Sequence, residues 1–285
     1  MFVKSTLAAV AVLASLAGTA AAPAQAEATK PAPVVVGQPL AQAHAHNDYE
    51  QDRPLFDALE HGFTSVEADV WLVDGELRVA HDREDVRPGV TLESLYLDPL
   101  QDLVRGQGHS VYPKWGGSLQ LLIDIKSDGE STYAAIEQEL AKHRDIMSRY
   151  SHGSTKTGPV AAVISGNRPL ATMQAQETRF SFYDGRSADL TSGIPAGLMP
   201  LVSDNWTKLF TWQGVGPMPE AERAKLRAYV ADAHANGYRV RFWATPDMPG
   251  AARDAVWNEL FDAGVDHINT DDLAALQQFL TARGA

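Results

Sequence analysis

Two carboxylates lie two positions apart within residues 64–72 (TSVEADVWL), a run with the composition of a β-strand. Side chains alternate along a strand, so Glu67 and Asp69 share one face while the apolar residues between them share the other. Neighbouring carboxylates repel each other and lose hydration unless a cation, a shared proton or hydrogen-bond donors compensate. The pair therefore predicts a cation site or, alternatively, a solvated edge strand whose acids face water.

A second acidic strand end occurs at residues 119–126 (LQLLIDIK), where Asp124 and Lys126 share one face. If both strands belong to one barrel, Asp124 is expected to supply a third oxygen ligand beside the first two acids. Three carboxylates with water and substrate oxygens are typical of a hard-cation site, so Mg²⁺ or Ca²⁺ is expected rather than zinc. The alternative is a plain ion pair between Asp124 and Lys126.

Three of the nine histidines are candidates for acid–base chemistry. His44 and His46 share one face of the first predicted strand, and His81 ends the run at residues 76–81 (ELRVAH). A general base and a general acid on opposite sides of a metal-bound phosphate require such a pair. The remaining histidines are interpreted as surface or structural residues: His61, His109, His143, His152, His234 and His267.

These residues need a scaffold that brings several strand ends together, and apolar runs alternate with helix-like stretches along the chain. The predicted strands span residues 42–47, 65–72, 119–126, 160–166, 179–184, 199–204, 239–244 and 267–271. The predicted helices span residues 54–61, 132–143, 169–176, 220–236, 250–263 and 273–282. This alternation predicts a single-domain α/β fold, the (β/α)8 TIM barrel. A doubly wound sheet is the alternative, but no glycine-rich nucleotide-binding motif follows the first strand.

The composition is that of a globular protein, because 45% of the 285 residues are hydrophobic and 21% are charged. The absence of cysteine excludes disulfides, thiolate metal sites and cysteine nucleophiles. The formal net charge of −12 argues against nucleic acid as a partner, since a polyanion would be repelled. It is compatible with a phosphate substrate, because a metal ion can invert the field of a small pocket.

The N-terminus has the pattern of a secretory signal peptide. Lys4 precedes an apolar run at residues 7–22, and residues 24–26 (AQA) provide the small-x-small pattern that signal peptidase cleaves. An uncleaved anchor is the alternative, although the run is shorter than the roughly 20 apolar residues that a membrane helix needs. We expect export. The expected parts are a signal peptide at residues 1–26, a flexible lead-in at 27–40 and the barrel domain at 41–285.

Three large aromatic side chains, Trp206, Phe210 and Trp212, follow the sixth predicted strand. In a loop on the site side of a barrel, they could grip an acyl chain, a sugar or a membrane interface. They could equally form a lid that packs on the barrel rim. The sequence leaves both interpretations open.

The order of these motifs resembles the glycerophosphodiester phosphodiesterases, which belong to the phospholipase-C-like phosphodiesterase superfamily of TIM barrels. That family shows His-Arg-Gly, a helix ending in glycine, Glu-x-Asp, an Asp-Gly turn, His-Asp, an acid-x-Lys strand end, and late Trp-Thr and Thr-Asp segments. Each motif is weak alone, but the ordered set is specific and covers nearly the whole chain after the signal peptide. The matching segments are residues 46–49 (HNDY), 55–62 (LFDALEHG), 67–69 (EAD), 74–77 (DGEL), 81–82 (HD), 124–126 (DIK), 242–245 (FWAT) and 268–271 (INTD).

The resemblance implies a role for each matching residue. His46 and His81 correspond to the two catalytic histidines, and the three carboxylates named above correspond to the metal ligands. The substrate-binding positions that it implies are Asn47, Lys126, which corresponds to the phosphate-binding lysine, and Trp243, which would form the pocket wall against the leaving group or a lipid.

Some positions depart from the family pattern. Asn47 replaces an arginine, so it can donate a hydrogen bond to a phosphate but brings no charge. Asp48 replaces a glycine, and Asp124 replaces the commoner glutamate, as in the similar sphingomyelinase D toxins. The HNDY motif is most similar to a less characterised exported and fungal branch of the superfamily. Arg168 could restore the lost charge, or it could be a surface arginine at a helix start.

Together these features predict an exported, metal-dependent phosphoric diester hydrolase that acts on glycerophosphodiester or phospholipid-derived substrates by histidine acid–base catalysis. A phosphatidylinositol- or sphingomyelinase-D-like phospholipase with the same residues is one alternative. A barrel that binds a phosphorylated or sugar ligand without turnover is the other. The expected partner is a small-molecule or lipid phosphodiester, with peripheral membrane contact for a lipid substrate and no contact with nucleic acid.

Overall fold

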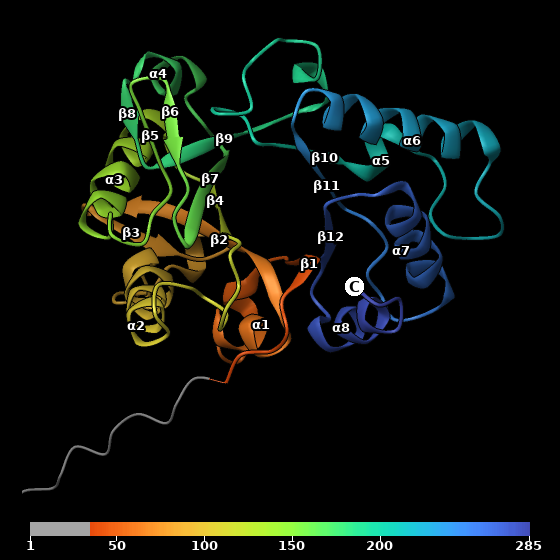
Figure 1. Ribbon diagram of the computed structural model, residues 1–285, viewed down its shortest axis with the longest axis horizontal. Helices are drawn as coiled ribbons and strands as arrows, with labels where there is room; N and C mark the ends of the chain where they lie inside the picture. Colours follow the sequence, from red (N-terminus) through yellow and green to blue (C-terminus); the bar gives the residue numbers. More distant parts are fainter. Residues whose placement is uncertain (1–34) are drawn as a thin grey trace, which may run out of the picture. The chain divides into compact units, whose positions relative to one another are not determined.

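The computed structural model describes residues 35–285 (Figure 1). The expected signal peptide, and the lead-in as far as residue 34, lie outside the described residues. Within the described part of the lead-in, the Gly37 N–H donates to the carbonyl of Leu59 (2.8 Å), and the first strand begins at Leu40. No helix within residues 35–285 is long and apolar enough to span a bilayer.

Eight parallel strands close into a barrel, which confirms the predicted TIM-barrel fold (Figure 1). The ring closes because β1 pairs with β2 on one side and with β12 on the other. Every predicted strand is present, with ends shifted by a few residues. The barrel strands are β1 (Leu40–Ala45), β2 (Phe63–Val73), β4 (Leu119–Ile125), β7 (Val160–Gly166), β9 (Ser181–Gly185), β10 (Leu201–Asn205), β11 (Arg239–Trp243) and β12 (His267–Thr270).

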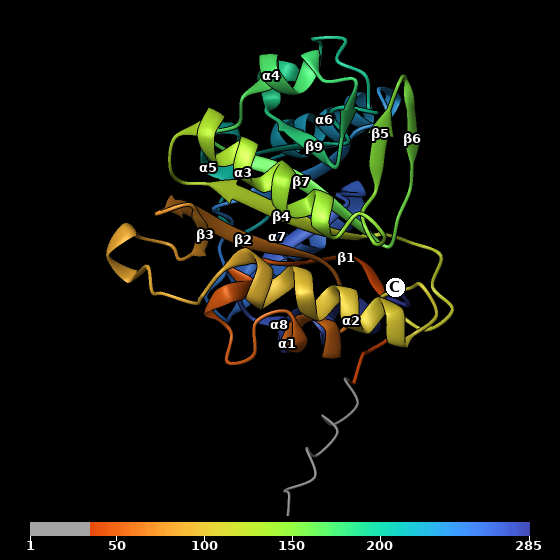
Figure 2. The same ribbon diagram turned by 90° about the vertical axis from the view of Figure 1, so that its left-hand side faces the viewer.

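Helices surround the barrel on its outer side, as the two views show (Figures 1 and 2). The six predicted helices are present; α6, for example, begins right after Pro219 and is followed by Gly237 at a φ of +77°. α2 was not predicted, and neither was the short helix α5, which begins at Trp206 where a loop was expected. The connection from β9 to β10 holds only the 3-10 helix η4 (Ser187–Asp189). The helices are α1 (Phe56–Glu60), α2 (Asp98–Gly106), α3 (Gly129–Lys142), α4 (Leu170–Ala175), α5 (Trp206–Leu209), α6 (Glu220–Ala235), α7 (Ala251–Ala263) and α8 (Leu273–Thr281).

Two additions decorate the barrel. β3 (Glu76–Val79) pairs antiparallel with the end of β2 and forms the predicted hairpin. A small antiparallel sheet, not predicted from the sequence, combines β5 (Arg149–Ser151), β6 (Ser154–Lys156) and β8 (Thr178–Arg179). The β5–β6 hairpin and the loop after β3 lie at opposite ends of the barrel (Figure 2). The small sheet is therefore remote from the carboxyl ends of the barrel strands.

The interior of the barrel divides into an apolar part and a polar part. The apolar part is a separate buried cluster of four side chains: Leu122, Val163, Phe182 and Leu201. The polar part is also buried and contains His44, Ser65, Glu67, Gln120, Arg241 and Asn269. Buried polar groups are costly unless they are hydrogen-bonded. The polar part therefore marks the side of the barrel on which a functional site is to be expected.

The aromatic residues after β10 are not available for a ligand or a membrane. Trp206 and Phe210 are fully buried and stack on each other with ring centroids 4.1 Å apart. Both rings also pack against Phe242 of β11, at 5.6 and 5.8 Å, and all three belong to the main hydrophobic core. Trp212 is 7% exposed, and its indole donates to backbone carbonyls of its own loop. Of the two interpretations left open by the sequence, packing is correct and a membrane-facing grip is not.

Candidate active site

A cavity of about 340 Å³ opens at the carboxyl ends of the barrel strands, the end at which TIM-barrel enzymes carry their active sites. Seven of the eight site residues predicted from the sequence line this cavity, and the eighth, Asp69, contacts two of them, His81 and Lys126. The lining residues are His46, Asn47, Glu67, His81, Asp124, Lys126, Ser165, Arg186, Arg241, Trp243 and Ala244.

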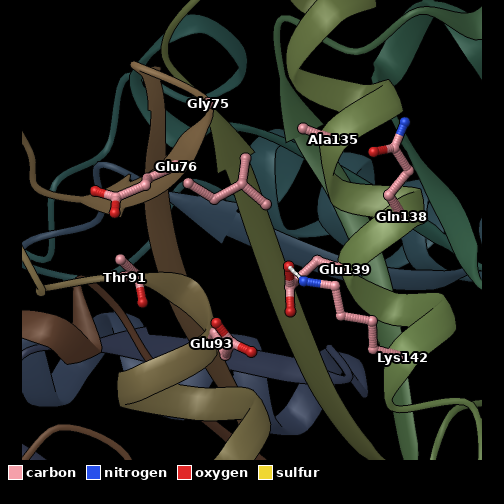
Figure 3. A pocket seen from close by; sticks show the side chains of 9 residues that line it. Gly75, Glu76, Thr91, Glu93, Ala135, Gln138, Glu139 and Lys142 are labelled. Carbon is pink, nitrogen blue, oxygen red and sulfur yellow. Dashed lines mark hydrogen bonds and ion pairs between the residues drawn. The ribbon is translucent and has the colours of Figure 1, made fainter.

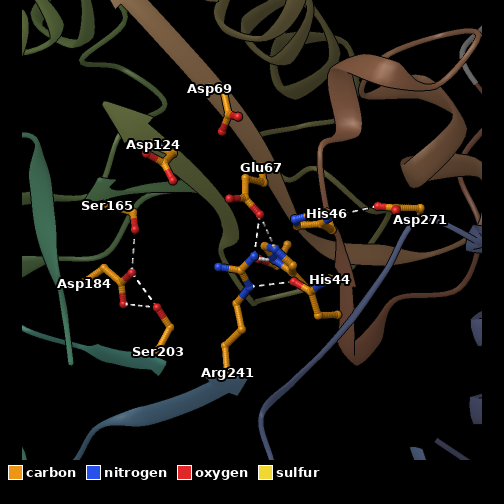
Figure 4. A network of polar contacts seen from close by, with 12 residues as sticks. His44, His46, Glu67, Asp69, Asp124, Ser165, Asp184, Ser203, Arg241 and Asp271 are labelled. Atoms are coloured by element: carbon orange, nitrogen blue, oxygen red, sulfur yellow. Dashed lines mark hydrogen bonds and ion pairs between the residues drawn. The ribbon is translucent and has the colours of Figure 1, made fainter. Parts of the chain in front are cut away.

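The three predicted metal carboxylates converge. Glu67 and Asp69 come from β2 and Asp124 from the neighbouring β4, with Asp69 and Asp124 directly opposite each other in the parallel pairing. One oxygen from each of the three lies within 4.8 Å of the others (Figure 4). The strand alternation inferred from the sequence is correct, because Val66, Ala68 and Val70 on the other face pack into the hydrophobic core.

Asp69 has one oxygen fully engaged and one free. Its Oδ2 accepts from the Tyr49 hydroxyl (2.7 Å), pairs with Lys126 Nζ (3.0 Å) and contacts His81 Nδ1 (3.1 Å). Its Oδ1 is buried and has no hydrogen-bond partner among the described residues. A buried carboxylate oxygen without a donor is costly. This unpartnered oxygen, beside Glu67 and Asp124, is the position at which a cation would be bound.

Glu67 is held deeper in the barrel by two donors on one oxygen. Arg241 on β11 donates to Glu67 Oε2, and His44 Nε2 lies 3.2 Å from the same atom (Figure 4). His44 Nδ1 in turn contacts the Ser65 hydroxyl (2.7 Å), so the imidazole is fixed at both ends. Burial alone would raise the pKa of Glu67, but Arg241 and His44 hold it well below its usual range. Glu67 is therefore a permanent carboxylate.

His44 serves this network as a neutral group. Burial first and then Arg241 lower the pKa of His44 to about 4. An imidazole with this pKa is unprotonated at neutral pH, so it can donate only one hydrogen bond, and Glu67 receives it. His44 thus positions a carboxylate, whereas His46, two residues later, lines the cavity.

His46 and His81 reach the cavity from two different elements. His46 follows β1, and its Nδ1 lies 2.8 Å from Asp271 Oδ1, which leaves Nε2 for a ligand (Figure 4). Burial lowers the pKa of His46, but the hydrogen bond to Asp271 and the negative charges of Glu67 and Asp271 together outweigh it, and the net pKa is raised. His81 lies two residues after the end of β3. Its Nδ1 contacts Asp69 Oδ2 (3.1 Å) and the Tyr49 hydroxyl (3.2 Å). Both imidazoles are oriented by an acid, as acid–base groups require.

The positive charges near Asp124 do not offset the cost of burying its carboxylate. Burial raises the pKa of Asp124 to about 6, against the lowering effect of Lys126, whose Nζ lies 3.5 Å from Asp124 Oδ2. Burial and then Glu67 also raise the pKa of Asp69. Three clustered acids face two cations, Lys126 and Arg241, and therefore leave an excess of negative charge. A divalent cation bound between them would relieve it.

Gly166 at the end of β7 makes room for Asp124. A Cβ at Gly166 would lie 2.1 Å from Asp124 Oδ1, and its backbone has a φ of +65°, in the left-handed region that favours glycine. The carboxylate therefore occupies the space that a side chain would fill. The oxygen-only donor set and the free oxygen on Asp69 fit a hard cation such as Mg²⁺ or Ca²⁺.

Of the three positions that depart from the family pattern, Asn47 and Asp48 have distinct structural roles. Asn47 lines the cavity with a φ of +45°, a conformation that asparagine tolerates better than most residues. Asp48 is buried and accepts from the Leu55 N–H (2.6 Å) and the Tyr96 hydroxyl (2.9 Å), which ties the loop after β1 to the start of α1. Burial raises the pKa of Asp48 to about 7. Asp48 is thus a structural residue.

Sequence reasoning missed several residues of the site. Arg241 lies two residues before Trp243 on β11, so strand alternation could have placed both on the inner face. Arg186 follows β9 directly and also lines the cavity. The hydroxyl of Tyr49 bonds Asp69, although the sequence assigned no role to that tyrosine. Arg168, proposed as a replacement cation, does not line the cavity; its guanidinium lies over the Tyr183 ring, 4.9 Å from the ring centre.

Another cavity, of about 270 Å³, lies outside the barrel between β3 and α3 (Figure 3). It is lined in part by Glu76, Glu93, Glu139 and Lys142, and Lys142 pairs with Glu139 at 2.7 Å. Its lining contains no histidine and none of the residues predicted to act in catalysis. The cavity at the strand ends is therefore the candidate active site.

Comparison with known proteins agrees with this geometry. The sequence family described as the AIM6-like phosphodiesterase domain matches residues 37–184, and the glycerophosphoryl diester phosphodiesterase family matches residues 239–274. The altered inheritance of mitochondria protein 6 homolog of Arthroderma benhamiae is 30% identical over 83% of this chain and 82% of its own length. The altered inheritance of mitochondria protein 6 of Eremothecium gossypii is 30% identical over 84% of this chain and 69% of its own length.

Solved structures share the fold. A glycerophosphodiester phosphodiesterase from Parabacteroides distasonis has a TM-score of 0.51 and 17% identity, over 87% of this chain and all of the other. The phosphatidylinositol-specific phospholipase C of Listeria monocytogenes has a TM-score of 0.50 and 10% identity, over 88% of this chain and 96% of the other. From the match over residues 37–184 and its 30%-identical relatives, the chain belongs to the AIM6-like phosphodiesterase family, within the glycerophosphodiester-phosphodiesterase-like TIM barrels.

Proposed function

We propose that this protein is a metal-dependent phosphoric diester hydrolase that acts on glycerophosphodiester or phospholipid-derived substrates. The observation that carries the proposal is the convergence of three carboxylates and two oriented histidines on one cavity at the carboxyl end of the barrel. Membership of a phosphodiesterase family supports the same reaction class. Specific chemistry is assigned from the site and not from the fold, because TIM barrels host many reactions.

Glu67, Asp69 and Asp124 are proposed to hold one Mg²⁺ or Ca²⁺ ion. When bound, the ion would polarise a non-bridging phosphate oxygen and offset the charge that develops in the transition state. Tyr49 keeps Asp69 in place through its hydroxyl, and Arg241 keeps Glu67 in place. Tyr49 bonds Asp69 through Oδ2, and Arg241 bonds Glu67 through Oε2. The second oxygen of each carboxylate is therefore left for a metal ion.

His46 and His81 are proposed to transfer the two protons of the reaction. One imidazole removes a proton from the attacking water or substrate hydroxyl, and the other donates a proton to the leaving alkoxide oxygen. Asp271 orients His46, and Asp69 orients His81, so each imidazole keeps its second nitrogen for substrate. The assignment of acid and base can be exchanged between them. Attack by a neighbouring hydroxyl of the substrate would give a cyclic phosphate first.

The remaining cavity residues are proposed to bind the substrate. Lys126 is the cation beside the acids, and the amide of Asn47 can donate to a phosphate oxygen. Trp243 forms part of the wall, where its ring can cover a leaving group or the glycerol end of a lipid. A lipid substrate would require the cavity mouth to approach a membrane surface. The N-terminal sequence supports export as the accompanying proposal.

The proposal is tested by turnover of bis-p-nitrophenyl phosphate with Mg²⁺, with Ca²⁺ and with a chelator. We expect turnover that chelator abolishes and that either cation restores. Comparison of a soluble glycerophosphodiester with phosphatidylinositol or sphingomyelin vesicles then separates the substrate classes. Turnover that is unaffected by chelator, or absent with every diester and cation, would contradict the proposal and favour a barrel that binds its ligand without turnover.

A further inference from the structure

Arg186 is a cation at the cavity that the sequence did not suggest. It follows the end of β9, lines the cavity and has a side chain that is 26% exposed. β9 pairs with β7 and β10, so Arg186 stands on the part of the rim that adjoins Ser165 and Ser203. Neither motif resemblance nor strand alternation had assigned it a role.

The buried carboxylate of Asp184 holds the guanidinium of Arg186 in place. Arg186 Nη1 lies 2.6 Å from Asp184 Oδ2, and its Nη2 donates to the Ser165 hydroxyl at 3.1 Å. Asp184 is fully buried and also accepts from the hydroxyls of Ser165 (2.8 Å) and Ser203 (2.6 Å), as Figure 4 shows. The carboxylate therefore accepts from three donor groups, and the buried acid and the two hydroxyls fix the orientation of the arginine.

The guanidinium of Arg186, which lines the cavity, retains donor capacity. Within residues 35–285, every hydrogen bond that this side chain donates comes from Nη1 or Nη2, and Nε donates none. An arginine fixed at one edge, with an unused N–H at a cavity, is suited to a planar or tetrahedral oxyanion.

The other cations of the cavity each pair with at least one of the three candidate metal carboxylates. Lys126 pairs with Asp69 and Asp124, at 3.0 and 3.5 Å. Arg241 is buried and donates to Glu67 and Asn269. Asn47 has no charge. Ser165, which Arg186 contacts, lies opposite Asp124 in the pairing of β4 and β7, so Arg186 is placed next to the metal carboxylates.

From this arrangement we infer that Arg186 binds a non-bridging oxygen of the substrate phosphate, on the side of the cavity formed by β7 and β9. The inference rests on the proposed function, since it concerns the same cavity and a phosphate-bearing substrate. Arg168 is excluded from this role because its Nη1 donates to the Gly166 carbonyl (2.8 Å) and its guanidinium covers Tyr183, a core residue. It provides a matched control.

The test is equilibrium binding of inorganic phosphate to the whole chain, measured by calorimetry with Mg²⁺ present. We expect Arg186→Gln to weaken phosphate binding by about 10- to 100-fold, the loss of one charged hydrogen-bonding group, with Mg²⁺ affinity unchanged. Arg168→Gln should bind phosphate like the wild type. Arg186→Lys should fall between them, because an ammonium keeps the charge and lacks the planar fork.

Arg186→Gln leaves Asp184 as a buried acid without its cation, so a second variant guards against misfolding. The double variant Asp184→Asn/Arg186→Gln removes both charges and should show the same loss of phosphate affinity with a cooperative thermal transition. Wild-type phosphate affinity in both variants, or an equal loss in Arg168→Gln, would overturn the inference. So would the absence of phosphate binding to the wild type up to about 10 mM.

Turnover distinguishes this inference from the proposed function. If phosphate binding depends on Arg186 but no diester is hydrolysed, Arg186 is an anion-binding residue and the proposed hydrolase activity is wrong. If diesters are hydrolysed and phosphate binding does not depend on Arg186, the hydrolase stands and the inference about Arg186 falls.

Discussion

Arg241 and Glu67, which are 174 positions apart in the sequence, form a buried ion pair across the interior of the barrel. Arg241 is on β11 and Glu67 on β2, and His44 of β1 contacts the same carboxylate oxygen. The pair links both halves of the chain, and both residues line the candidate active-site cavity. It explains how a carboxylate with a free oxygen is kept ionised inside a barrel.

This pair predicts a specific pattern of stability. Arg241→Gln should lower the free energy of unfolding by about 3–5 kcal/mol, because Glu67 would remain buried without its cation. Glu67→Gln/Arg241→Gln should recover a large part of that loss, since neither charge remains. Chemical denaturation of three variants in chelator, the single variants Arg241→Gln and Glu67→Gln and the double variant, measures the coupling. Additive losses in the double variant would contradict the pairing, and diester turnover should stay low in all three.

A second prediction concerns Gly166, whose missing side chain leaves space for the Asp124 carboxylate. Gly166→Ala should lower Mg²⁺ affinity by about 10-fold or more, because the new Cβ would displace Asp124 Oδ1. Gly193→Ala is the matched control, since Gly193 has a φ of +72° and nothing within 4 Å of an added Cβ. The control should lose only about 1 kcal/mol of stability to backbone strain. Equal Mg²⁺ affinity in both variants would refute the argument.

The pH dependence of stability provides a third prediction. Asp124 has a pKa of about 6 in the folded chain against an ordinary 3.8, so the folded state holds this proton more tightly than the unfolded state. Below about pH 4 the acid is protonated in both states and imposes no penalty. As the pH rises from about 4 through 6, the free energy of unfolding of the metal-free chain should fall, by up to about 3 kcal/mol from this group.

The comparison that isolates Asp124 is the variant Asp124→Asn, which cannot ionise at this position. Its stability in chelator should fall less steeply over the same pH range, although Asp48 and Asp69, whose pKa values are also raised, still contribute. Excess Mg²⁺ should remove the difference at pH 7 by stabilising the wild type. Parallel pH profiles of the two chains in chelator would show that Asp124 is not strained by burial.

A fourth prediction concerns the two histidines. His46→Ala and His81→Ala should each slow turnover of bis-p-nitrophenyl phosphate by about 10²–10⁴-fold with little change in Mg²⁺ affinity. His152→Ala is the control, because His152 is an exposed histidine on the β5–β6 hairpin at the other end of the barrel. Thermal melting identifies any variant that fails to fold. A double histidine variant as active as the wild type would remove the acid–base assignment.

Much of the fold was predictable because the strand pattern is local. Each barrel strand is an apolar or alternating run, and alternation alone placed Glu67 and Asp69 on one shared face. The missed helix α2 (Asp98–Gly106) has a different cause: Pro99 and a proline- and glycine-containing neighbourhood weaken the helical signal, while tertiary packing of Leu100 and Val104 stabilises it. The small sheet of β5, β6 and β8 consists of two- and three-residue strands, which are too short to show a period.

The residues of the candidate site could be predicted from the sequence only where they belong to a recognisable motif. The motif residues, from His46 to Lys126, meet at one end of the barrel because parallel strand ends meet there. Arg186 was missed because an arginine just after a strand is usually a surface residue. Arg241 lies within a predicted strand, and its alternation with Trp243 could have placed it on the inner face. Closure of the barrel brings Arg241 to Glu67. Arg168 was a reasonable candidate by position alone, yet its side chain turns toward Tyr183.

The central claim is that Glu67, Asp69 and Asp124 hold one divalent cation. Anomalous diffraction from crystals grown with Mn²⁺ tests it directly. The account predicts one strong anomalous peak between these three carboxylates, and its loss in Asp69→Asn crystals. A peak only at the other acidic group of the described residues, formed by Glu93, Asp98 and His143, or no bound Mn²⁺ at the barrel mouth, would contradict the account.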